Sequence, residues 1–170
     1  MPGPTLYIAS GLEFHTYARD GMLRDVVKAV RDMGFGVIDP FADNNQLSRA
    51  QELTVEQELT IANLDVTGVR GADGVLCIVS SPIPDEGSMI EVGMAMAWGK
   101  PVFYLNDDVR HRPKEGHLPM NPMLFCHTSS DTWRQYYYTS VDGLRDPQKA
   151  LHKWIVHTKR DIERIVQVSR

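Results

Sequence analysis

The feature that most constrains the fold of this chain is a short apolar run near its middle, residues 74–79 (GVLCIV). A strand with one face in water alternates apolar and polar side chains, whereas a strand covered on both faces is apolar throughout. The run therefore predicts a strand of a parallel sheet that lies between two layers of helices. Thr5–Ser10 and Pro101–Leu105 have the same character, and Val37–Ile38 predicts a shorter strand that ends before a proline.

Segments with helical spacing of apolar residues separate these strands. The predicted helices are Met22–Met33, Arg49–Arg70, Ser88–Trp98 and a last one at about 147–168, and Trp133–Ser140 predicts a fifth strand. The second helix carries an apolar stripe formed by Val55, Leu59, Ala62, Val66 and Val69. Alternating strands and helices indicate a doubly wound α/β domain with helices on both faces of a parallel sheet.

The length and composition fit one soluble domain. The 170 residues show no linker or internal repeat, so we expect a single domain over residues 1–170. A net charge of −4 argues against a nucleic-acid partner, and no apolar run reaches the length of a membrane span. The N-terminus has no basic region before an apolar one, and Cys77 and Cys126 have the apolar surroundings of buried free thiols. These features predict a cytoplasmic protein.

The common motifs of α/β enzymes do not occur in this sequence. It has no G-x-G-x-x-G after the first strand, no phosphate-loop lysine motif and no G-x-S-x-G. The histidines have no metal-ligand spacing; they are His15, His111, His117, His127, His152 and His157. Because ligands of such folds bind beyond the carboxyl ends of the strands, we expect the site in the loops at 9–14, 40–46, 80–88 and after Leu105.

Glu91 is the only charged residue between Gly87 and Gly99. Ser88 and Glu91 have the spacing of a capping box, in which the glutamate bonds back to the first turn of its helix. A carboxylate in such apolar surroundings also loses hydration, and this makes it a candidate for chemistry. The two interpretations are compatible, since a helix N-terminus stabilises a nearby anion.

Asp85, Asp65 and Tyr7 are the candidate partners of Glu91. Asp85 lies on the loop before the helix of Glu91, Asp65 adjoins the apolar stripe of the preceding helix, and Tyr7 lies within the first strand. Taken singly, each has an ordinary structural explanation: a solvated turn, a helix surface and a core aromatic. Carboxylates that converge on one edge fit glycosyl chemistry, in which one attacks the anomeric carbon and another handles the proton of the leaving group.

The pattern as a whole resembles the nucleoside 2-deoxyribosyltransferases. The likeness runs from Leu6 to Tyr138, and its most specific part is the D-x-G-x-x-x-E element of Asp85, Gly87 and Glu91. The matching segments are Tyr7–Ser10, Asn45–Gln46, Asp65, Ala72–Gly74, Pro84–Ala95, Gly99–Val102 and Asn121–Leu124. The resemblance implies a flavodoxin-like fold with a five-stranded parallel sheet.

The resemblance also implies roles for individual residues. Glu91 would attack C1′ of a 2′-deoxynucleoside and form a deoxyribosyl ester that a second base resolves, with retention of configuration. Tyr7 would orient Glu91, and Asp85 and Asp65 would hold the base and move its proton. Gln46 would contact the base, and Asn121 of a neighbouring subunit would bind the hydroxyl end of the sugar.

Further expectations follow from the same resemblance. Base specificity would depend on the pocket near Gln46, Phe14 and Met123. No metal or organic cofactor is needed, because the substrate itself is the electrophile. The partners would be 2′-deoxynucleosides and free purine or pyrimidine bases, in a homo-oligomer built from dimers that share the site.

Two alternatives remain open from the sequence. The first is a hydrolase on the same scaffold that cleaves deoxynucleoside 5′-monophosphates with water as the acceptor. Such hydrolases hold the phosphate with serine and arginine near the first strand, where this chain has Ser10–His15 and no arginine before Arg19. The second is a non-catalytic nucleotide-binding module.

Overall fold

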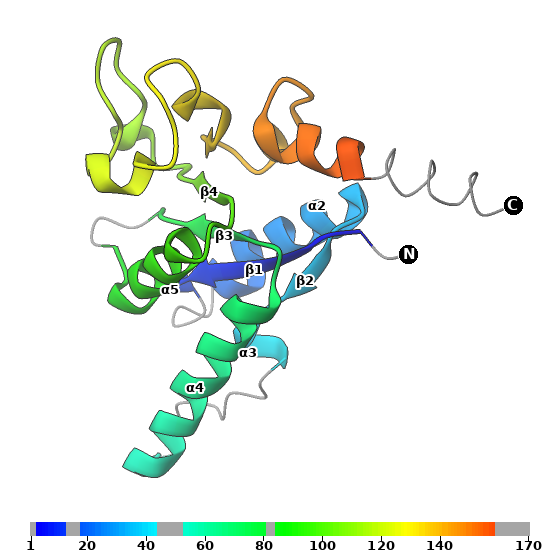
Figure 1. Cartoon of the computed structure of the whole chain (residues 1–170), viewed down its shortest axis with the longest axis vertical. Helices are drawn as coiled ribbons and strands as arrows, with labels where there is room; N and C mark the ends of the chain where they lie inside the picture. The colour runs from blue at the N-terminus through cyan, green and yellow to red at the C-terminus, as the bar shows by residue number, and fades with distance from the viewer. Residues whose placement is uncertain (1–2, 13–17, 44–52, 81–83, 159–170) are drawn as a thin grey trace, which may run out of the picture.

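The computed structural model describes residues 3–12, 18–43, 53–80 and 84–158 (Figure 1). It contains a five-stranded sheet in the order β2-β1-β3-β4-β5, in which all paired strands are parallel. The strands are β1 (Thr5–Ser10), β2 (Gly36–Ile38), β3 (Gly74–Ile78), β4 (Val102–Leu105) and β5 (Tyr137–Tyr138). This is the strand order of flavodoxin-like folds, so the predicted fold class is confirmed.

The two faces of the sheet belong to two separate apolar clusters. Along β1, Leu6 and Ile8 face one cluster, whereas Tyr7 and Ala9 face the other. The register pairs Tyr7 with Val75 and Ala9 with Cys77, so the side chains of β3 alternate in step with those of β1. All five residues of β3 are buried, as an apolar strand between two layers requires.

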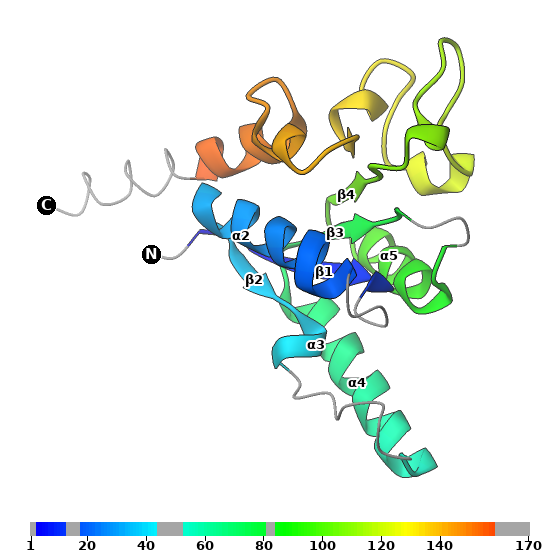
Figure 2. The same cartoon turned by 180° about the vertical axis from the view of Figure 1, so that it is seen from behind.

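Helix α2 (Arg24–Met33) and residues 150–158 cover one face of the sheet (Figure 2). A π-helical turn, η2 (Arg19–Leu23), precedes α2. Gly34 ends α2 at a φ of 103°, a left-handed conformation that glycine adopts without strain. Residues 150–158 confirm part of the predicted last helix, and the remainder of it, from residue 159 on, lies outside the described residues.

Helices α4 (Val55–Gly71) and α5 (Glu86–Ala97) lie on the opposite face (Figure 1). Helix α4 begins later than the predicted start at about Arg49, a residue that lies outside the described ones. The helix begins at Val55, because Thr54 is its N-cap and forms a reciprocal capping box with Gln57. Helix α5 begins two residues earlier than predicted, at Glu86.

The N-terminal half of α4 projects away from the sheet (Figures 1 and 2). Val55 and Leu59 of the predicted apolar stripe are 71% and 60% exposed, whereas Val69 near the other end of the helix is fully buried. The stripe therefore does not pack along its whole length against this chain's own sheet. Its first two members form an apolar surface that is open to solvent.

The C-terminal end of α4 is held by Lys100. Its Nζ donates hydrogen bonds to the carbonyl oxygens of Val69, Arg70 and Ala72. These carbonyls belong to the end of the helix, where hydrogen-bond partners within the helix are lacking and a cation is favoured by the helix dipole. Lys100 thus joins the start of β4 to the helix that carries Asp65.

The connection from β4 to β5 is built of short helical turns. They are η3 (Val109–His111), η4 (Pro122–Phe125) and η5 (Trp133–Gln135), and η6 (Asp142–Arg145) follows β5. Another short helix, α3 (Pro40–Asp43), follows β2. The Tyr104 hydroxyl donates to the carbonyl of Leu124 at 2.6 Å, which ties η4 to β4.

The two cysteines differ in their surroundings. Both are free thiols, but Cys77 is buried in β3 and Cys126 is exposed after η4, so the prediction of two buried thiols was wrong for Cys126. The Cys126 sulfur lies 3.7 Å from the sulfur of Met96 at the surface of α5. Across the described ranges, no helix combines the length and apolar character that crossing a bilayer requires.

Candidate active site

The structure brings Tyr7 and Glu91 into direct contact. The Tyr7 hydroxyl donates a hydrogen bond of 2.6 Å to Oε1 of Glu91, across 84 positions of sequence. Tyr7 is fully buried in β1, and Glu91 is half-buried in the second turn of α5. A donor with a fixed backbone and a short hydrogen bond to a carboxylate holds that carboxylate in one orientation.

The structure contradicts the capping-box interpretation of Ser88 and Glu91. Asp85 is the N-cap of α5, with extended dihedrals of −68° and 129°, and Ser88 is the third residue of the helix. Aspartate is as good an N-cap as serine, and the earlier start moves Glu91 away from the first turn. Glu91 instead accepts a hydrogen bond from Tyr7, so its carboxylate is directed toward β1 and not toward the first turn of its own helix.

Asp85 lies at the carboxyl edge of the sheet, next to the end of β1. Its Oδ2 accepts hydrogen bonds from the backbone N–H of Ser88 at 2.8 Å and from the Ser88 hydroxyl at 2.9 Å. A β-carbon added to Gly11 would lie 2.9 Å from Cβ of Asp85, too close for a real contact. Only glycine lets the chain after β1 approach Asp85 in this way.

Cys77 is a buried thiol of β3 near both Glu91 and Asp85. Burial raises the pKa of its thiol far above the usual range, and the negative charges of Glu91 and Asp85 raise the pKa further. Cys77 pairs with Ala9 in the sheet and belongs to the cluster that contains Tyr7. The site therefore has an apolar floor under Glu91 and Asp85.

Helix α4, which carries Asp65, packs on Tyr7. A β-carbon at Gly68 would lie 2.9 Å from Cε2 of Tyr7, so α4 packs directly on the tyrosine ring at this position. Asp65 precedes Gly68 by three residues, so it lies on a neighbouring part of the same side of the helix, about one turn toward its N-terminus. Asp65 is half-buried there.

The remaining predicted residues fall into two groups. Asn121 is the N-cap of η4, and its Oδ1 accepts from the backbone N–H of Met123 at 3.0 Å. Asn121 is exposed, and the side chain of Met123 is 77% exposed. Gln46 and Phe14 lie outside the described residues, so their predicted contacts with the base are not placed by the structure.

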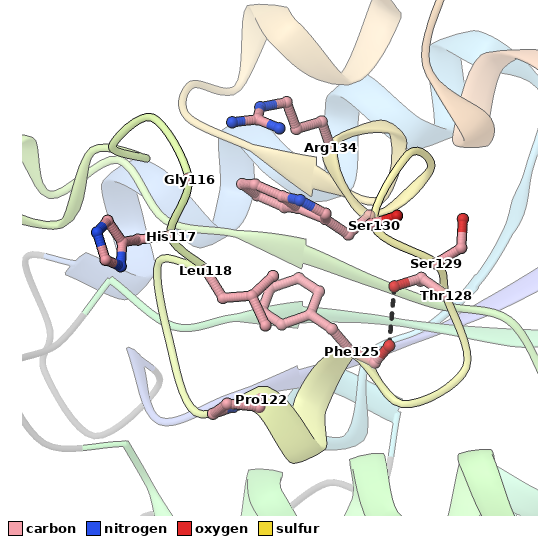
Figure 3. Close-up of a pocket in the computed structure, with 10 residues that line it drawn as sticks. Gly116, His117, Leu118, Pro122, Phe125, Thr128, Ser129, Ser130 and Arg134 are labelled. Carbon is pink, nitrogen blue, oxygen red and sulfur yellow. Dashed lines mark hydrogen bonds between the residues drawn. The ribbon is translucent and has the colours of Figure 1, made fainter.

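A cavity of about 410 Å³ lies beside η4, in the connection from β4 to β5 (Figure 3). Phe125, Leu118 and Arg134 are among the residues that line it, and the Thr128 hydroxyl donates to the carbonyl of Phe125 at 2.8 Å. Among the described residues that line the cavity, none was predicted for the site, although Pro122 stands between Asn121 and Met123. The described residues also contain no group of three or more metal-ligating side chains.

A family model for nucleoside 2-deoxyribosyltransferases matches residues 6–123, well over half of the chain. The chain belongs to this family. The match includes both carboxylates of the D-x-G-x-x-x-E element, Asp65, and the two residues that flank Pro122. No curated protein matches the chain in sequence.

Two solved structures share the fold of this deoxyribosyltransferase family member, and a third shows a weaker similarity. The 2-deoxyribosyltransferase of Bacillus psychrosaccharolyticus is 20% identical with a TM-score of 0.62, covering 84% of this chain and 90% of its own. A conserved protein of Enterococcus faecalis V583 is 19% identical with a TM-score of 0.57, covering 91% and 98%. A CMP N-glycosidase of Clostridium botulinum is 16% identical with a TM-score of 0.45, covering 82% and 92%.

The sequence reasoning missed three residues that shape the site of this family member. Gly11 and Gly68 provide the close approaches to Asp85 and Tyr7, and Ser88 donates twice to Asp85. The D-x-x-S spacing of Asp85 and Ser88 is itself an N-cap signal and could have revealed the third. The glycines give no such signal, because their role depends on which elements pack together.

Proposed function

We propose that this protein transfers 2-deoxyribose from a 2′-deoxynucleoside to a free nucleobase, with Glu91 as the nucleophile. The observation that carries the proposal is the 2.6 Å hydrogen bond from the Tyr7 hydroxyl to Oε1 of Glu91. Membership in the nucleoside 2-deoxyribosyltransferase family supports the reaction class. Asp85, the N-cap of the helix that carries Glu91, lies beside Gly11 at the carboxyl end of β1, where an α/β sheet binds its ligands.

The first half of the reaction forms a covalent ester. The Glu91 carboxylate attacks C1′, the bond from C1′ to the base breaks, and its electron pair remains on the leaving nitrogen. Asp85 and Asp65 hold the base and supply its proton. The hydrogen bond from Tyr7 to Oε1 orients the Glu91 carboxylate for this attack.

The second half reverses these steps with a new base. The ester must persist until the acceptor arrives, so water has to be kept from it. Met89, Met94 and Met96 pack against the apolar cluster that contains Tyr7, and Cys77 closes the floor. This apolar lining favours transfer to a base over hydrolysis.

Product analysis tests the reaction directly. The purified protein is incubated with deoxyinosine or thymidine as donor, with and without adenine, and products are separated by chromatography. We expect 2′-deoxyadenosine only when adenine is present, and no product with Glu91→Ala. Glu86→Ala, an exposed glutamate in the first turn of the same helix, is the matched control and keeps the activity.

Two other outcomes of this assay would point elsewhere. Free base released equally without adenine, chiefly from a deoxynucleoside monophosphate, would assign the chain to a hydrolase on this scaffold. Arg19, the first arginine of the chain, already bonds Asp20 at 2.9 Å and lies over the ring of Phe41. Absence of any reaction, with ligand binding that Glu91→Ala leaves unchanged, would assign a binding module.

The site is proposed to be completed by a second copy of the chain. Asn121 and Met123 stand at an exposed turn, and apolar side chains are exposed on α4 and α5; these are Val55, Leu59 and Ile90. Such a surface is typical of an interface between subunits. A homo-oligomer built from dimers, in which Asn121 reaches the sugar held by its neighbour, accounts for both features.

A mixing experiment tests the shared site. Glu91→Ala and Asn121→Ala are each expected to be inactive as pure proteins. After subunit exchange, half of the dimers are mixed and each contains one intact site, so about a quarter of the wild-type activity returns. Activity that stays at the level of the pure variants would place Asn121 in the site of its own chain.

A further inference from the structure

Asp85 binds Ser88 through one carboxylate oxygen only. The backbone N–H and the hydroxyl of Ser88 both donate to Oδ2, at 2.8 and 2.9 Å. Within the described part of the chain, no hydrogen bond reaches Oδ1. The two oxygens of this carboxylate are therefore in different states before any substrate binds: Oδ2 is engaged and Oδ1 is open.

A glycine lies beside each oxygen. A β-carbon at Gly87 would lie 3.2 Å from Oδ2, and one at Gly11 would lie 3.5 Å from Oδ1 and 2.9 Å from Cβ of Asp85. Gly11 directly follows β1, so Oδ1 faces the carboxyl edge of the sheet, where ligands of this fold bind. A side chain at position 11 would occupy the space between Oδ1 and that edge.

We infer that the two oxygens of Asp85 have different roles, and that Gly11 and Ser88 are the positioning residues that hold the carboxylate in the orientation these roles require. Oδ2 caps the helix that carries Glu91, while Oδ1 exchanges the proton of the nucleobase. The inference rests on the proposed function and adds to it two residues that were not among the predicted site residues.

The proton step balances as follows. As Glu91 attacks C1′, the electron pair of the breaking bond moves into the ring of the leaving base. The proton on Oδ1 of Asp85 moves to a ring nitrogen of that base, which leaves neutral, and Asp85 becomes a carboxylate. The acceptor base then returns a proton to Oδ1 as its own nitrogen attacks C1′ of the ester.

A donor whose base leaves without gaining a proton distinguishes a loss of proton transfer from a general disturbance of the structure. In 7-methyl-2′-deoxyguanosine the base is already cationic, so it leaves as a neutral molecule when the bond to C1′ breaks. Its cleavage requires Glu91 but not Oδ1 of Asp85. Deoxyguanosine, its unmethylated counterpart, requires both.

Gly11→Ala is the decisive variant. The added methyl displaces Asp85, and a misplacement of this size lowers the rate of a positioned proton transfer by about tenfold to 100-fold. We expect this loss in the single-turnover rate at which guanine is released from deoxyguanosine without an acceptor, and little change in the release of 7-methylguanine from 7-methyl-2′-deoxyguanosine. Gly21→Ala, where a methyl meets nothing within 4 Å, is the matched control and keeps both rates.

Two further variants test the roles of the Asp85 carboxylate and of the Ser88 hydroxyl. Asp85→Asn retains the N-cap but cannot supply the proton, so it should show the same donor preference as Gly11→Ala in stronger form. Ser88→Ala removes the hydroxyl bond and leaves the backbone bond, so it should show the preference in weaker form. Melting temperatures of all variants show whether they are folded.

The outcomes separate the inference from the proposed function. Equal losses of rate with both donors in Gly11→Ala, or no loss with either, would overturn the separate roles of the two oxygens but not the proposed transferase function. A wild-type protein that transfers deoxyribose from neither donor overturns the proposed function itself. A loss confined to deoxyguanosine supports the inference.

Discussion

Replacing Tyr7 with phenylalanine tests the contact on which the proposed mechanism depends. The change removes one hydroxyl from a fully buried side chain and leaves the ring in β1. The lost hydrogen bond to Oε1 of Glu91 is short, at 2.6 Å, and is assisted by the charge of the carboxylate. Hydrogen bonds of this kind contribute about 1.5–3 kcal/mol.

The effect on the rate follows from that figure. If the bond holds Glu91 in its reactive orientation, its loss raises the barrier by about the same amount, which is roughly a tenfold to 150-fold decrease in kcat/KM. The free energy of unfolding should fall by only about 0.5–1.5 kcal/mol, since half-buried Glu91 can be solvated by water. Chromatographic transfer assays and denaturant unfolding measure the two quantities.

Tyr138→Phe is the matched control on the other face of the sheet. Tyr138 is also a buried strand tyrosine, and its hydroxyl accepts a hydrogen bond of 2.9 Å from the backbone N–H of Leu151. Its loss leaves that N–H unpaired, so stability should fall by about 1–3 kcal/mol while transfer is unchanged. Full transfer activity in Tyr7→Phe would refute the assignment of Tyr7 as the residue that orients Glu91.

Three further measurements address other parts of the structure. Gly68→Ala should cost about 1–3 kcal/mol of stability in urea unfolding, because the methyl meets a tyrosine ring at 2.9 Å, whereas Gly71→Ala meets nothing and should not destabilise. Lys100→Met should cost about 1–3 kcal/mol, because it leaves three carbonyls at the end of α4 without their cation; an unchanged unfolding midpoint would contradict this. With iodoacetamide at pH 8 to 9.5, mass spectrometry should find Cys126 modified and Cys77 intact, because burial raises the pKa of Cys77 and only a thiolate reacts.

The parts of the fold that the sequence could predict are those in which the local pattern and the burial agree. The apolar run at 74–79 identified the central strand, and the alternation of strands and helices identified the doubly wound architecture. Gly34 ended its helix as predicted, because a left-handed residue there is a local requirement. These properties depend on residues that are neighbours in the chain.

The errors occurred where two local signals competed or where tertiary structure decided. Thr54 with Gln57 outcompeted the earlier start predicted at Arg49, and Asp85 outcompeted Ser88 as the N-cap of α5. The exposure of Val55 and Leu59 could not be predicted, since apolar spacing shows which face a helix would bury but not whether a partner covers it.

One contact of the candidate site could be predicted from the sequence, and others could not. The isolation of Glu91 among apolar residues was visible in the sequence, and its pairing with Tyr7 is confirmed by the structure. The role of Gly11 beside Asp85 was not visible, because it depends on a contact across 74 positions. Close approaches of this kind are set by packing.

Capping of α5 by Asp85 has a mechanical consequence for the chemistry. Asp85 and Glu91 are six residues apart on one helix, about 9 Å along its axis, so they move as parts of one rigid body. Any displacement of α5 therefore shifts the proton carrier and the nucleophile together, and their separation stays constant through both halves of the reaction. The leaving base and the arriving base are thus presented with the same spacing between acid and nucleophile, which is what a reaction that runs through the same ester in both directions needs.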